Sequence, residues 1–130
     1  MVETKKTKRD YLDFSTAQDA FERGNYRGAF HEWHSLERKM KETGKLNGEF
    51  PDSFIDLGIE IHERVFEENY KNSKRLRRVN HNTLISFDMY IDSILLKISK
   101  RCGPETVDEL LNRISKAQKM LYKIRDISGL

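Results

Sequence analysis

Residues 51–66, PDSFIDLGIEIHERVF, decide the fold of this 130-residue chain. Pro51 and Asp52 stand in the order typical of a helix start. At about 100° per residue, the apolar side chains that follow cover an arc of roughly 200°. A helix that is apolar over more than half of its circumference is packed on two sides, so we expect it at the centre of a helical domain. Its apolar positions are Phe54, Ile55, Leu57, Ile59, Ile61, Val65 and Phe66.

Four further segments combine helical periodicity with boundary residues. We expect helices over residues 15–23, 26–43 and 83–101, and a last helix that starts at Pro104. The helix that starts at residue 51 is expected to end near Asn72 and Ser73, or to continue into the basic stretch behind them. The predicted fold class is therefore all-α, a single-domain bundle of four to five helices.

Three residues are assigned to the helix ends. Gly24 supplies the left-handed stop between the first two helices, and Asn25 is the expected N-cap of the second. Asn82 is the expected N-cap of the helix over residues 83–101. Residues 1–12 have no apolar periodicity, so we expect a basic flexible tail followed by one helical domain over residues 13–130.

Composition limits the classes of function. The chain has 24 Lys and Arg against 21 Asp and Glu, and this net charge of +3 does not by itself demand nucleic acid or a membrane as partner. The 37% of hydrophobic residues can fill one core, while 35% charged residues are typical of long solvated helices. Cys102 is the only cysteine, so no disulfide forms within the chain. The polar N-terminus and the lack of a long apolar run predict a cytoplasmic protein without a membrane segment.

Residues 17–36, AQDAFERGNYRGAFHEWHSL, resemble one tetratricopeptide repeat. Ala17 and Ala20 lie on the short first helix, the turn follows at residues 24–26, and Ala29 and Trp33 lie on the second helix. No second copy follows one period later. The resemblance implies an N-terminal helical hairpin of the kind that binds other proteins.

The run over residues 71–81, KNSKRLRRVNH, is the strongest charge feature. Its cations can contact nucleic-acid phosphates or an acidic protein, with Lys5, Lys6, Lys8 and Arg9 as an auxiliary arm. Alternatively, Arg77 and Arg78 form solvated ion pairs with Glu67 and Glu68. The candidate contact residues are Lys71, Lys74, Arg75, Arg77 and Arg78.

Arg75 and His81 are spaced in a way that resembles the Arg-x(4–6)-His signature of nuclease-type HEPN domains, which are helical bundles. That resemblance implies a ribonuclease. His31 and His34 are spaced for one metal ion, but their helix places His31 on its solvated side, and no third ligand is evident. We therefore predict no catalytic residue, no metal and no cofactor.

Two further groups of residues stand out. His62 lies within the apolar arc of the central helix, and Asn69 lies near the same line along that helix. The two residues either line a buried polar pocket, or His62 is a core histidine that is hydrogen-bonded to a facing helix. Ile85, Met89 and Leu96 form a second apolar stripe on the next helix, either packed inside the chain or forming a homodimer patch.

These observations favour a small cytoplasmic protein-interaction module, an adaptor or scaffold, over an enzyme. Its expected partner is another protein or a second copy of itself. Nucleic-acid binding through residues 71–78 is the alternative, and a HEPN-like ribonuclease is a remote third.

Overall fold

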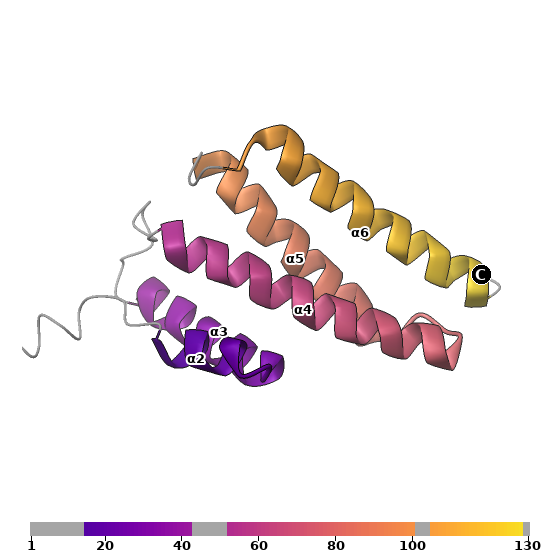
Figure 1. Ribbon diagram of the computed structural model, residues 1–130, viewed down its shortest axis with the longest axis horizontal. Helices are drawn as coiled ribbons and strands as arrows, with labels where there is room; N and C mark the ends of the chain where they lie inside the picture. Colours follow the sequence, from indigo (N-terminus) through magenta and orange to yellow (C-terminus); the bar gives the residue numbers. More distant parts are fainter. Residues whose placement is uncertain (1–14, 43–51, 101–104, 129–130) are drawn as a thin grey trace, which may run out of the picture. The chain divides into compact units, whose positions relative to one another are not determined.

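The computed structural model of the protein describes residues 15–42, 52–100 and 105–128. Within these ranges all regular elements are helices, so the all-α prediction is confirmed. The contacts divide the chain into two units, Met1–Glu49 and Phe50–Leu130, each of which is described by itself. The predicted tail and the predicted domain boundary at residue 13 lie outside the described residues. The helices are α2 (Ser15–Glu22), α3 (Tyr26–Glu42), α4 (Asp52–Leu76), α5 (His81–Lys100) and α6 (Val107–Ser128) (Figure 1).

The first unit contains a hairpin of α2 and α3. Gly24 has a φ of 80°, in the left-handed region, and so ends α2 as predicted. Asn25 caps α3 as predicted, because its side-chain oxygen accepts a hydrogen bond from the Gly28 N–H at 3.1 Å. A β-carbon at position 28 would collide with the Asn25 amide, so a larger residue there would force the capping side chain to shift. Ala17, Ala20, Ala29 and Trp33 are buried.

The second unit is a bundle of three helices. α4 and α5 form an antiparallel hairpin, and α6 packs against both. Because α6 also returns antiparallel to α5, it runs in the same direction as α4, and the two helices end on the same side (Figure 1). The Phe66 ring lies 5.7 Å from that of Phe87 and stacks 6.3 Å from that of Tyr90. The buried apolar residues of this unit include Ile55, Ile59, Phe66, Tyr90, Ile94, Leu110, Ala117 and Ile124.

A chain of hydrogen bonds joins α4 to the start of α5. The Asn80 N–H donates to the Ser73 hydroxyl at 3.0 Å, and the Ser73 and Thr83 hydroxyls are 2.8 Å apart. The Thr83 hydroxyl donates in turn to the Asn69 carbonyl at 2.9 Å. Ser73 and Thr83 are both fully buried, so each hydroxyl must find its partner inside the protein. We call Asn69, Ser73, Asn80 and Thr83 the polar lock.

The C-terminus of α4 ends in a motif that usually contains glycine, but here it contains arginine. The Arg78 N–H bonds to the Ser73 carbonyl at 3.2 Å and the Arg77 N–H to the Lys74 carbonyl at 3.3 Å, which is the Schellman pattern. Arg77 occupies the left-handed position of this motif with a φ of 55°, where glycine is usual. α4 therefore runs through Asn72 and Ser73 into the basic stretch, the longer of the two predicted ends.

Two predicted helix starts are wrong. The N-cap of α5 is Asn80 rather than Asn82, since the Asn80 side-chain oxygen accepts from the Asn82 N–H at 2.9 Å. The described part of α6 begins at Val107, not at Pro104, which lies outside the described residues. Thr106 and Glu109 form a reciprocal capping box with bonds of 3.1 and 3.2 Å. Asn80 and Thr106, each two residues from the predicted position, are thus the residues that cap α5 and α6.

We expect Arg77→Gly to give a more stable protein than Arg77→Ala by roughly 0.5–1 kcal/mol. Both changes remove the same charge, but only glycine adopts the left-handed conformation without a steric cost. Urea unfolding of the full chain measures the difference. Equal free energies of unfolding for the two variants would contradict the conformation assigned to Arg77.

Candidate functional site

The five cations singled out in the sequence lie together at the α4–α5 turn. Lys71, Lys74 and Arg75 occupy the last turns of α4, Arg77 and Arg78 lie in the turn itself, and all five side chains are exposed. Arg75 donates to the Asn72 side-chain oxygen at 2.6 Å.

None of these five cations forms a salt bridge with a residue in the described ranges. The alternative in which Glu67 and Glu68 neutralise Arg77 and Arg78 is therefore not the observed arrangement. Glu67 instead lies 3.5 Å from Arg64, one turn earlier on α4. Within the described residues, the positive charge of the turn is therefore not neutralised by an ion pair.

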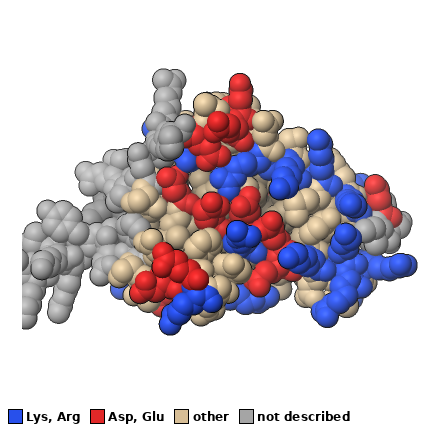
Figure 2. Space-filling view, viewed as in Figure 1, with Lys and Arg blue, Asp and Glu red and all other residues tan. Residues whose placement is uncertain are grey.

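The C-terminal half of α6 adds cations to the same end of the unit, because α6 runs parallel to α4. Lys119, Lys123 and Arg125 are all exposed. Sequence reasoning did not group them with residues 71–78, since the direction of α6 becomes known only from the packing. We call residues 71–81 and 119–126 the basic end; it contains eight Lys and Arg and a single carboxylate, Asp126. Figure 2 shows Lys and Arg side chains, in blue, gathered on the part of the surface where the α4–α5 turn lies.

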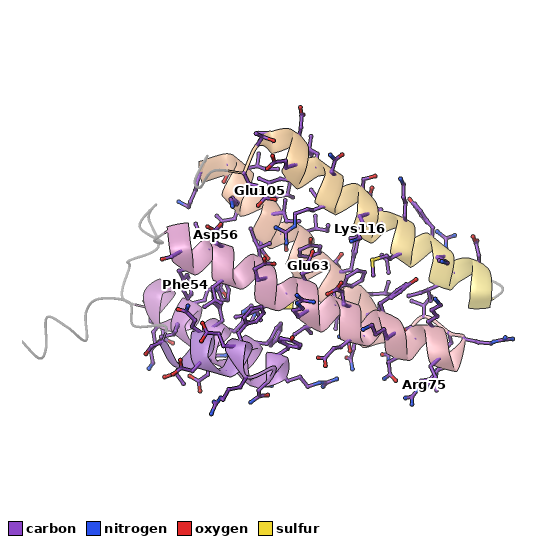
Figure 3. The ribbon with its side chains drawn as sticks, in the orientation of Figure 1. Phe54, Asp56, Glu63, Arg75, Glu105 and Lys116 are labelled. Carbon is purple, nitrogen blue, oxygen red and sulfur yellow. The ribbon has the colours of Figure 1, made fainter. Side chains whose placement is uncertain are left out.

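The opposite part of the same bundle carries an ion-pair network that the sequence did not reveal. In Figure 3, Asp56 of α4 and Glu105, two residues before α6, lie at this end, while Arg75 lies at the other end of α4. Lys97 of α5 is only 4% exposed and donates to Asp56 at 2.6 Å and to Glu105 at 3.4 Å. Arg113 of α6 also bonds to Glu105 at 3.4 Å, so Glu105 joins the two cations.

Arg113 extends the network to two more carboxylates and a phenol. Its guanidinium lies 3.1 Å from Glu60 and 3.3 Å from Glu63, and its Nε donates to the Tyr90 hydroxyl at 3.1 Å. The Tyr90 hydroxyl donates to Glu63 at 2.8 Å. All three helices of the bundle thus contribute to one connected group. We call Asp56, Glu60, Glu63, Tyr90, Lys97, Glu105 and Arg113 the ion-pair network.

The network shifts the protonation of its own members. Burial and the hydrogen bond to Glu63 raise the pKa of Tyr90 well above its usual value, which keeps the phenol neutral. Burial alone lowers the pKa of Lys97, but the bonds and charges of Asp56 and Glu105 outweigh it, and the pKa is raised. The Lys97 amine therefore stays protonated, which excludes it as a nucleophile near neutral pH.

A pocket of about 390 Å³ lies over this network, and its walls are formed by Asp56, Ile59, Glu60, Lys97, Glu105, Glu109 and Arg113. Lys97 and Arg113 in the lining are paired with Asp56, Glu60 and Glu105, and Glu109 accepts a hydrogen bond from the Thr106 N–H. In the described part of the chain, no buried side-chain nitrogen or oxygen lacks a hydrogen-bond partner. The side chains of the ion-pair network therefore hold α6 against α4 and α5 by hydrogen bonds and ion pairs.

His62 and Asn69 are both buried but have separate partners on α5. The Ser93 hydroxyl lies 2.9 Å from the His62 Nδ1 and also donates to the Met89 carbonyl at 2.6 Å. The Asn69 amide donates to the Ser86 hydroxyl at 3.2 Å. The pocket over the ion-pair network is lined by neither residue. His62 is thus bonded to a hydroxyl of a facing helix, which is the second of the two arrangements weighed from the sequence.

The second stripe of α5 is partly open to solvent. Ile85 is 44% exposed, whereas Met89 and Leu96 are half-buried. Leu84 and Leu95 on the same helix are 44% and 48% exposed. The exposed apolar surface of α5 is therefore wider than the stripe predicted from the sequence.

The remaining candidates stay apart or are paired. His31 is exposed, and the His34 Nδ1 lies 3.1 Å from Glu37. Among the described residues no group of three or more His, Cys, Asp or Glu side chains is placed to hold a metal ion. Arg75 and His81 lie on the two sides of the α4–α5 turn, both exposed, and form no hydrogen bond with each other.

Comparisons of the chain with models of known protein families, with curated proteins and with solved structures found no match. A search of the described helices for one both long and apolar enough to cross a bilayer was likewise negative. The function of the protein is therefore inferred from the charges, contacts and exposure of its own residues.

We expect Arg113→Met to lower the free energy of unfolding by about 1–3 kcal/mol, because it removes charged hydrogen bonds that join three helices. Arg64→Met is the matched control, since Arg64 is exposed on α4 and its change breaks the solvated pair with Glu67, which should cost less than about 0.5 kcal/mol. Urea unfolding of both variants measures this. An equal, small cost for both changes would show that the network does not hold α6.

Proposed function

We propose that this protein is a small helical binding module whose basic end engages nucleic acid. The observation that carries the proposal is the gathering of cations from α4, the α4–α5 turn and α6 at one end of a bundle, with a single carboxylate among them. Cations that neutralise phosphates release condensed counterions, and this release supplies most of the affinity of non-specific nucleic-acid binding.

The distribution of the other charges supports the same proposal. The carboxylates Asp56, Glu60, Glu63 and Glu105 lie in the ion-pair network, away from the basic end, and neutralise Lys97 and Arg113 there. A net charge of +3 therefore conceals a bundle with one strongly positive end. Such a local field steers a polyanion to one surface even when the charge of the whole chain is small.

The rigid support of the turn favours binding through this surface. The polar lock and the Schellman motif fix the backbone of the turn by hydrogen bonds on both sides. Exposed cations on a fixed backbone lose less conformational freedom on binding than cations on a mobile loop. Arg77 holds an uncommon left-handed conformation for a non-glycine residue in the same turn.

We expect full-length protein to shift a fluorescently labelled oligonucleotide at low salt, with log K falling linearly as log salt rises. The double variant Arg75→Gln/Arg78→Gln should reduce the steepness of this salt dependence by roughly 1.5, since it removes two phosphate contacts. The matched control Arg27→Gln/Arg38→Gln alters two exposed arginines of α3 and changes the net charge equally. It should leave the salt dependence unchanged.

Two results would overturn the proposal. One is a lack of binding to any oligonucleotide at low salt. The other is polyglutamate of matched charge binding as tightly as the oligonucleotide, which would mark the basic end as a surface for an acidic protein.

A second candidate function, association through α5, is favoured by the exposed apolar side chains of that helix. Leu84, Ile85 and Leu95 are each between 44% and 48% exposed, with Asp88 and Asp92 exposed on the same side. Exposed apolar residues grouped on one helix are typical of contact surfaces. This is the protein-interaction module predicted from the sequence, with a second copy of the chain as the simplest partner.

We expect light scattering at high protein concentration to give the mass of a dimer, and Ile85→Lys to return it to the monomer mass of 15.4 kDa. A charge placed in an isologous interface is repeated across the two-fold axis and opposes association. A monomer mass for the unaltered protein at high concentration would contradict this function. Leu111→Lys, on α6, is the control and should leave the mass unchanged.

A further inference from the structure

The basic end contains an aromatic side chain that packing does not account for. Tyr122 of α6 is 58% exposed, the highest exposed fraction among the large hydrophobic side chains of the described residues. Its neighbours one turn away on the helix are Lys119 and Arg125, both exposed. The Arg125 guanidinium lies 6.0 Å from the centre of the Tyr122 ring. Tyr122 is therefore an exposed aromatic ring beside two exposed cations.

Because Tyr122 lies within the basic end, this surface contains both cations and an aromatic ring. Lysine and arginine side chains attract phosphates, whereas an aromatic ring stacks on the face of a nucleobase. Every base has such a face, so stacking of this kind is tolerant of sequence. The bases of a duplex are stacked on one another and are not open to a ring on the outside of a helix, while the bases of a single strand are.

We propose that the basic end binds single-stranded nucleic acid, with a base stacked on Tyr122 and the flanking phosphates held by Lys119, Arg125 and the cations of the α4–α5 turn. This inference rests on the proposed function of the basic end and adds the class of nucleic acid. Tyr122 contributes the preference for single strands, and the cations contribute the salt-dependent affinity for both forms.

The placement of the cations on separate elements agrees with a short strand rather than with a groove of duplex DNA. The cations come from the C-terminal ends of two parallel helices and the turn after one of them. No single helix of the unit presents the whole set, as a helix that enters a major groove would. A flexible strand can pass from the turn to α6 and contact both groups.

Fluorescence anisotropy tests this with a labelled 12-nucleotide oligouridylate and with a labelled DNA duplex of equal phosphate number, both at low salt. We expect the single strand to bind more tightly than the duplex. Tyr122→Ala should weaken single-strand binding on the order of tenfold, because it removes one base–aromatic stack. The same variant should leave duplex binding nearly unchanged. Tyr122→Phe keeps the ring and should retain the affinity of the unaltered protein.

Leu111→Ala is the matched control, since Leu111 is 48% exposed on the same helix and lies nearer its N-terminal end, outside the basic end. It should change neither affinity. Circular dichroism of each variant verifies that its helices are intact, and Tyr122 is exposed enough for its truncation to leave the core unaltered.

The outcomes separate this inference from the function on which it rests. Duplex binding at least as tight as single-strand binding, with both unaffected by Tyr122→Ala but weakened by Arg75→Gln/Arg78→Gln, would overturn the single-strand inference and leave the proposed function intact. A lack of binding to both probes at low salt would overturn both. Equal losses on both probes for Tyr122→Ala would also overturn the inference, because stacking on an exposed base would not account for them.

Discussion

The polar lock between α4 and α5 is the interaction on which the rest of the second unit depends. Ser73 and Thr83 are fully buried, and their hydroxyls link the backbone N–H of Asn80 to the backbone carbonyl of Asn69. Buried hydroxyls have no water to compensate for a lost partner, so the two helices are held in one register. That register fixes the α4–α5 turn, and with it the direction in which five cations extend from the protein.

The direction of α6 then determines how charge is distributed over the bundle. Because α6 runs parallel to α4, its C-terminal cations join those of the turn, while Glu105 before its first residue meets Lys97 and Arg113 at the opposite end. In the described residues, one packing arrangement therefore produces both the ion pairs at one end and the cluster of cations without ion pairs at the α4–α5 turn. The ion-pair network therefore supports the basic end indirectly, by holding α6 against α4 and α5.

The sequence predicted the elements better than the site. Helical periodicity located each of the five helices in the described residues, and the N-cap at Asn25 and the stop at Gly24 were correctly assigned because their chemistry is local. The caps at Asn80 and Thr106 were missed, since several residues near each helix start can cap it. The cations of residues 71–78 were found as a run. Their partners on α6, and the pairing of Lys97 with Asp56 across 41 positions, depend on tertiary packing and leave no local pattern.

The most direct test of the account is a titration of the isotope-labelled full chain with a single-stranded oligonucleotide at low salt, followed by the backbone amide signals in NMR spectra. If the basic end is the binding surface, the shifts should be confined to residues 71–81 and 119–126, and the amides around the ion-pair network should stay in place. Shifts on the outward face of α5 or in α2 and α3 without shifts at the basic end, or a complete lack of shifts, would contradict the account.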